Sequence, residues 1–92
     1  MNIRPNHARS RRALAMALLR HGDAPGAAEQ IQAALALSPE DPDALKEMGA
    51  ICLVLAQPGQ ALYHLERAGK INPEDEEIIL LLGKARQALQ GK

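Results

Sequence analysis

Residues 42–75, PDALKEMGAICLVLAQPGQALYHLERAGKINPED, decide the fold of this 92-residue chain, because the flanking sequence repeats them at a fixed distance. Gly49 and Gly83 are separated by this distance, which is called here the repeat period. The same distance separates residues 38–41, Ser-Pro-Glu-Asp, from residues 72–75, Asn-Pro-Glu-Asp. A period of about 34 residues indicates a structural unit that stacks on copies of itself.

The composition favours helices and gives no sign of catalysis. Hydrophobic residues make up 47% of the chain, mostly Ala, Leu and Ile, with one Tyr and no Phe or Trp. Ala and Leu are strong helix formers, whereas strands prefer β-branched and aromatic residues. The single cysteine, Cys52, excludes an internal disulfide and lies on an apolar helical stripe, where it acts as a small hydrophobe. We predict one all-α domain that is not an enzyme and has no catalytic residues, metal site or cofactor.

Start and stop signals predict five helices joined by short loops. The first is expected at about residues 7–21, the second from Asp23 to about residue 37, the third from Pro42, the fourth after residues 57–59, and the fifth at about residues 76–89. Asp23 and Asp41 are expected N-caps, and Gly22 is expected to end the first helix. The first helix has an apolar stripe of Leu14, Ala15 and Leu18. Loops this short make neighbouring helices antiparallel.

The pattern of the central unit resembles the tetratricopeptide repeat. That family carries Trp, Leu-Gly and Tyr on a first helix, Ala and Phe on a second, and a closing Pro. The positions that carry the resemblance are Leu45, Met48, Gly49, Cys52, Ala61, Leu65 and Pro73. Small residues recur at Ala15, Gly49 and Gly83, where a side chain of one carbon or none allows close helix approach. An unrelated antiparallel bundle is the alternative.

The resemblance implies a right-handed superhelical stack of antiparallel helix hairpins, an α-solenoid of about two and a half repeats. It divides the chain into an N-terminal arm at residues 1–7, repeat units at residues 8–41 and 42–75, and a capping helix at residues 76–92. The units and the capping helix form a single domain, residues 8–92. The chain is expected to be a whole protein or part of a longer solenoid.

Proteins of this family are mostly interaction modules whose first helices line a concave face, so the resemblance implies an adaptor or a chaperone-like scaffold. The candidate groove residues are Arg12, Met16, Leu19, Arg20, Lys46, Ala50, Leu53, Val54, Leu80, Leu81 and Lys84. This surface is apolar with a basic edge, which suits an amphipathic helix or an apolar peptide with some negative charge. Alternatively, the apolar members beyond residue 50 complete packing within the molecule.

One subset of the family clamps the C-terminal carboxylate of heat-shock chaperones with Lys, Arg and Asn side chains. Here Arg12 stands at one clamp position, but Met16 and Glu47 stand where Asn is expected. Glu77 and Leu81 replace basic residues. A carboxylate would meet repulsion and no amide donors, so this activity is not expected.

The charge is zero overall but unevenly distributed. Residues 1–21 carry five arginines and no acid, whereas residues 22–92 carry six basic and eleven acidic side chains. An alternative function is therefore the binding of nucleic acid or an acidic surface through the arginine-rich first helix. The acidic remainder and the lack of stacking aromatics oppose nucleic-acid binding.

The last helix carries five consecutive apolar residues, Ile78 to Leu82. A terminal cap of a repeat array has a polar outer face, and a helix that is apolar all round is normally buried. We therefore expect this helix to pack against a second copy, giving a homodimer, or against a partner. No apolar run is long enough to span a membrane, and we predict a cytoplasmic location without membrane contact.

Overall fold

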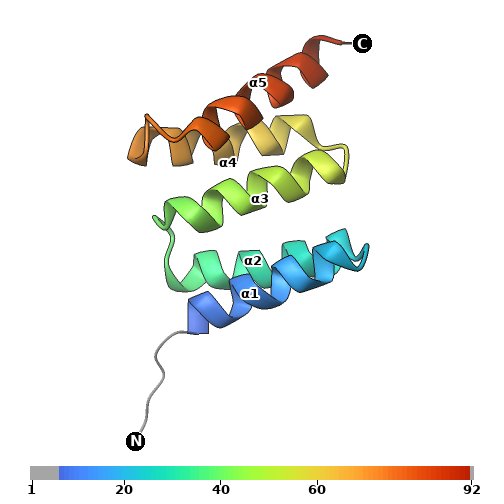
Figure 1. The fold of residues 1–92 in the computed structure, drawn as a ribbon, viewed down its shortest axis with the longest axis vertical. Coiled ribbons are helices and arrows are strands. Elements are labelled where there is room, and N and C mark those ends of the chain that lie inside the picture. Colours follow the sequence, from blue (N-terminus) through green and yellow to red (C-terminus); the bar gives the residue numbers. More distant parts are fainter. Residues whose placement is uncertain (1–6, 92) are drawn as a thin grey trace, which may run out of the picture.

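The computed structural model describes residues 7–91, and over that range the chain is all-α, with five helices and no strand. The helices are α1 (His7–Arg20), α2 (Ala24–Leu37), α3 (Pro42–Val54), α4 (Pro58–Ile71) and α5 (Glu76–Gln90). They follow one another along the long axis of the molecule from the N-terminal to the C-terminal end (Figure 1). Residues 1–6 of the expected N-terminal arm lie outside the described residues.

Aspartate side chains cap the N-termini of α2, α3 and α5, and the sequence predicted the first two of these caps. The Asp23 carboxylate accepts a hydrogen bond from the Gly26 N–H at 2.9 Å, and Asp41 accepts one from the Asp43 N–H at 3.0 Å. Asp75 caps α5 in the same way. Each cap pairs a backbone donor that the first helical turn cannot satisfy internally.

The loops within the two hairpins use a left-handed residue. Gly22, just after α1, has φ 87°, and Ala56, just after α3, has φ 60°. These two residues are one repeat period apart, so the turn geometry repeats although the residue type does not. A left-handed conformation is strained for alanine but not for glycine.

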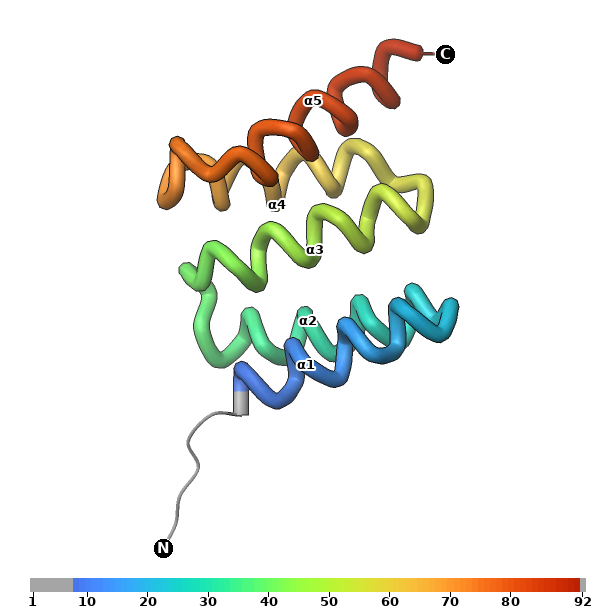
Figure 2. The backbone as a smooth tube through the Cα atoms, viewed as in Figure 1, coloured from blue at the N-terminus to red at the C-terminus, as the bar shows by residue number. Residues whose placement is uncertain are grey.

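The helices form two hairpins, α1 with α2 and α3 with α4, which stack through α2 and α3 (Figure 2). Helix α5 packs on α4 and also contacts α3. The fully buried large side chains are Ile31, Leu45, Ile51, Leu65, Ile78 and Cys52. The core consists of two clusters, and the half-buried Leu35 and Leu82 pack against both. The larger cluster contains residues from all five helices.

Glycine at position 49 permits the close approach within the second hairpin. The Leu65 side chain of α4 lies directly against Gly49 of α3, and a Cβ added at Gly49 would collide with it. Ala61, on the same face of α4, is fully buried. Gly49 thus marks the contact between the two helices of this hairpin, as the sequence predicted. The same prediction is wrong for Gly83, where an added Cβ would find nothing within 4 Å.

Two apolar residues that the sequence placed on buried faces are exposed. Leu14 was expected on the stripe of the first helix, and this prediction is wrong, because 47% of its surface is accessible. Ile79 occupies the position of the buried Leu45 one repeat later but is 55% exposed. Both residues lie on the terminal helices of the stack, where no other described helix covers their side.

Candidate functional site

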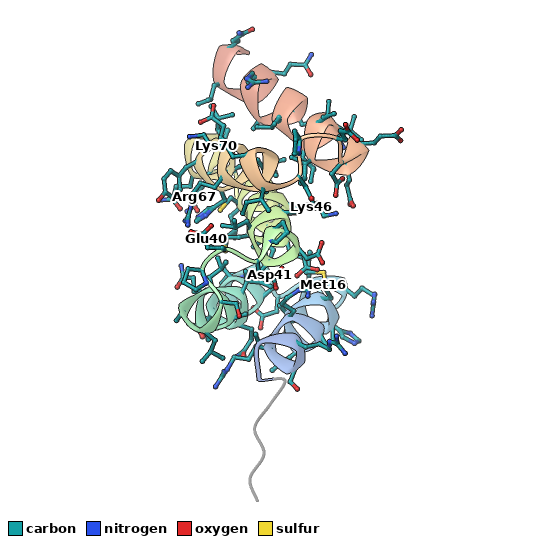
Figure 3. The ribbon with its side chains drawn as sticks, turned by 90° about the vertical axis from the view of Figure 1, so that its left-hand side faces the viewer. Met16, Glu40, Asp41, Lys46, Arg67 and Lys70 are labelled. Carbon is teal, nitrogen blue, oxygen red and sulfur yellow. The ribbon has the colours of Figure 1, made fainter. Side chains whose placement is uncertain are left out.

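A hollow of about 370 Å³ lies where α1, α3 and α5, the first helices of the successive units, face the same side. Its apolar lining comes from Met16 and Leu19 of α1, Ala50 of α3 and Leu81 of α5, all of them partly buried. Figure 3 shows that Met16 and Lys46 point to one side of the stack, whereas Arg67 and Lys70 point to the other. The hollow therefore opens on the face made by the first helices.

The sequence-predicted groove residues divide into two groups. Six of the eleven line this hollow: Arg12, Met16, Leu19, Lys46, Ala50 and Leu81. The other five do not line it. Leu53 packs against the core, Val54 and Leu80 are 62% and 59% exposed, and Arg20 and Lys84 are exposed.

Arg12 joins α1 to α3 at the wall of the hollow. Its Nε and Nη2 atoms donate to the two carboxylate oxygens of Glu47 at 2.9 and 3.0 Å. Asp41 and Asp43 lie within 3.8 and 4.0 Å of the same guanidinium. The hydrogen bond to Glu47 is the main cause that raises the pKa of Arg12. A bidentate pair of this kind fixes both side chains.

Lys46 makes the corresponding connection from α3 to α5. Its Nζ lies 3.1 Å from a carboxylate oxygen of Asp75 and 3.1 Å from one of Glu77. Burial acts to lower the pKa of Lys46, but the hydrogen bonds to Glu77 and Asp75 outweigh it and raise the pKa. The pKa of Asp75 is lowered, first by the hydrogen bond from the Ile78 N–H and then by Lys46.

These contacts form an ion-pair ladder, defined here as Arg12 with Asp41 and Asp43, and Lys46 with Asp75 and Glu77. Each member of the second rung lies one repeat period after its equivalent in the first. In each rung, a basic side chain on one first helix reaches the N-cap and the first turn of the next first helix. The ladder was not predicted from the sequence, although its basic and acidic residues recur at the repeat period.

The ladder changes the electrostatic character of the hollow. The basic edge expected from Arg12 and Lys46 is neutralised, because both side chains are ion-paired. Three acidic residues, Asp43, Glu47 and Glu77, also line the hollow. The hollow therefore does not support the expectation that the bound peptide carries negative charge.

The arginine-rich first helix is also partly engaged. Arg11 donates to the Gln30 side chain at 3.0 Å, and Arg12 is held by Glu47. Arg9 and Arg20 are exposed, and Arg4 lies outside the described residues. Within residues 7–91, only Arg12 among these arginines of α1 is ion-paired, so the nucleic-acid alternative loses one of its charges.

The stacked helix hairpins define the α-solenoid class of helical repeat proteins. Residues 8–51, which include α2 and nearly all of α1 and α3, match the family model described as tetratricopeptide repeat. The chain matches no curated protein. This match and the stacked hairpins support a protein of the tetratricopeptide repeat family.

Tetratricopeptide repeats generally mediate protein–protein interactions, and the fold is typically a scaffold without catalytic function. Among the helices of residues 7–91, none combines the length and the apolar character needed to cross a membrane.

Proposed function

We propose that this protein is an adaptor or chaperone-like interaction module that binds an amphipathic helix or an apolar extended peptide in the hollow of α1, α3 and α5. The observation that carries the proposal is the hollow itself, whose apolar lining comes from three separate first helices. A side chain inserted there would contact all three first helices at once.

The charges around the hollow narrow the chemistry of the partner. Arg12 and Lys46 are already paired, so an incoming carboxylate would compete with Glu47 and Asp75 for them. An extra negative charge would also face the acids of the rim. The partner that fits best has apolar anchors flanked by neutral or basic residues.

A peptide-display selection tests the proposal with a matched pair of variants. Ala50→Leu fills the floor of the hollow, while Ala36→Leu makes the same change at an exposed position on α2. Peptides enriched on the wild-type protein should be apolar or amphipathic and should lose binding to Ala50→Leu but not to Ala36→Leu. Peptides that bind all three proteins equally would show that the hollow is not the site.

Self-association through α5 and a cytoplasmic location, both expected from the sequence, are further parts of the proposal. The exposed apolar side chains of Leu80 and Leu89 on α5 support coverage by another chain. Sedimentation equilibrium of the wild type and of Leu80→Glu tests whether that chain is a second copy. A monomer at all concentrations would leave a different protein as the occupant. Cell fractionation tests the location.

A further inference from the structure

A second groove, separate from the proposed peptide site, lies between α4 and α5. Its volume is about 480 Å³, and Gly69 of α4 and Ile78, Ile79 and Leu82 of α5 form its apolar lining. Lys70, which also lines this groove, points to the side of the stack opposite Met16 (Figure 3). The two grooves therefore use different faces of α5.

The molecule contains the equivalent groove one repeat earlier, between α2 and α3, and there α4 fills it. Leu45 of α3 and Ala68 of α4 share a buried cluster against which Leu35 of α2 packs. Leu65 of α4 occupies the space left open by Gly49. Helix α4 is thus an internal example of what such a groove accepts.

The α4–α5 groove keeps the same features without a helix over them. Ile79 is 55% exposed, whereas its equivalent Leu45 is 0% exposed. A Cβ added at Gly83 would find nothing within 4 Å, whereas one added at its equivalent Gly49 would meet Leu65. The space above Gly83, beside the residues that line the groove, is therefore open.

The two grooves also resemble each other at the end near the joint that precedes the first helix. Arg67 of α4 donates to the carbonyl oxygen of Pro39 at 3.3 Å, in the joint that precedes α3. Pro73, one repeat period after Pro39, lines the open groove in the joint that precedes α5. In a helix seated in the register of α4, an arginine at the position equivalent to Arg67 would lie near the Pro73 carbonyl.

Helix α4 shows the face that the filled groove accepts, and α2 carries the same face within its own hairpin. In α4 it is Ala61, Leu65 and Ala68, and in α2 it is Ala27, Ile31 and Ala34; all six are 0% exposed. The common spacing is Ala-x3-Leu/Ile-x2-Ala. Since both copies of this face are buried inside their own hairpins, a second folded molecule cannot offer either one. The occupant is therefore a helix other than α2 or α4 of a second folded copy.

The rim adds a preference of charge. Lys70 and Arg86 face the groove with one acid, Glu66, and the Glu66–Arg86 contact is long at 4.0 Å between half-exposed side chains. An acidic side chain on the flank of the incoming helix would find Arg86 or Lys70 available.

We infer that the α4–α5 groove binds an amphipathic helix of another protein that carries an Ala-x3-Leu/Ile-x2-Ala face, with its large residue seated over Gly83. Packing of this kind is helix-in-groove recognition, in which a narrow apolar face supplies the affinity and the glycine sets the register. The inference does not depend on the peptide site between α1, α3 and α5.

The probe for this inference is a labelled peptide with the sequence of residues 57–71, because that segment carries the required face. A lactam bridge on its outer side keeps it helical, since an isolated helix of this length is marginal in water. Fluorescence anisotropy with the full chain should show saturable binding. Leu65→Ala in the peptide, or Gly83→Ala in the protein, should weaken binding about tenfold or more.

Two control variants separate this site from its alternatives. Gly59→Ala adds the same methyl group at a glycine with open space around it, and it should bind the peptide as the wild type does. Ala50→Leu blocks the peptide hollow and should also leave this binding unchanged, so failure of one proposal is distinguishable from failure of the other. Thermal unfolding of Gly83→Ala, a substitution that favours helix, shows that the variant is folded.

Three results would overturn the inference. The first is the absence of saturable binding by the helical peptide. The second is binding that survives Gly83→Ala, as it would if the peptide displaced the α4 of the protein itself. The third is a dimer in sedimentation equilibrium that Gly83→Ala dissociates, because the occupant would then be a second copy.

Discussion

The groove between α2 and α3 and the groove between α4 and α5 are built by the same repeat, yet only the first is filled. Leu45 and Ile79 occupy equivalent positions and differ completely in burial, at 0% and 55% exposed. Gly49 and Gly83 are the same residue, one against Leu65 and the other in open space. The comparison shows that the repeat specifies a contact face, while burial depends on whether a neighbour is present.

The largest expected difference between the two regions comes from truncating the paired apolar residues. Leu45→Ala should lower the free energy of unfolding by about 2–5 kcal/mol, because it removes a fully buried side chain and leaves a cavity. Ile79→Ala should change it by less than about 1 kcal/mol. Urea unfolding of both variants measures the difference. Similar losses at both positions would mean that another chain covers α5 in solution.

Substitution by alanine should change the free energy of unfolding in opposite directions at Gly49 and Gly83. Gly49→Ala pushes a methyl group into Leu65 and should destabilise the protein by about 1–3 kcal/mol. Gly83→Ala meets no neighbour and should stabilise it by about 1 kcal/mol through helix propensity. Thermal unfolding at low protein concentration compares them. Destabilisation by Gly83→Ala would contradict an open groove in the free protein.

Substitutions in the turn between α3 and α4, and in its equivalent between α1 and α2, should change stability by a smaller amount. Ala56 has φ 60°, a region where alanine is strained, whereas the equivalent Gly22 has φ 87° without penalty. Ala56→Gly should therefore stabilise the protein by about 1 kcal/mol, and Gly22→Ala should destabilise it by a similar amount. Chemical denaturation checks both, and a loss of stability in Ala56→Gly would show that the turn is unstrained.

Removing the Asp75 carboxylate from the second rung of the ladder should have the smallest effect on stability, and this effect should depend on pH in the acid range. The pKa of Asp75 is lowered in the folded protein, so the unfolded chain binds its proton first as the pH falls. Stability from Asp75 is therefore complete above its ordinary pKa of 3.8 and is lost as the pH falls through the lower folded value. Asp75→Asn should be less stable than the wild type at neutral pH and should show a shallower decline below pH 3.8. Parallel acid unfolding curves would contradict this.

Much of the fold was predictable because its signals are local. Asp23 and Asp41 mark helix starts through side chains that act within one turn, and the repeat period determined the order of the hairpins. The exposure of Leu14 was not predictable from the pattern, because periodicity identifies an apolar face but not what lies opposite it. The ladder was missed for a related reason: Arg12 and Glu47 are distant in sequence, and only stacking brings them together.

The ion-pair ladder connects only the first helices, so the two sides of the stack are held by different forces. Arg12 and Lys46 link α1 to α3 and α3 to α5 beside the hollow. Helix α4 packs against α3 and α5 mainly through apolar contacts, with one long Glu66–Arg86 contact between half-exposed side chains. Salt screens the first kind of contact and leaves the second almost untouched. We therefore expect the curvature of the molecule, and with it the width of the hollow, to vary with ionic strength. The affinity of the hollow for a bound peptide would then change with the salt concentration of the surroundings.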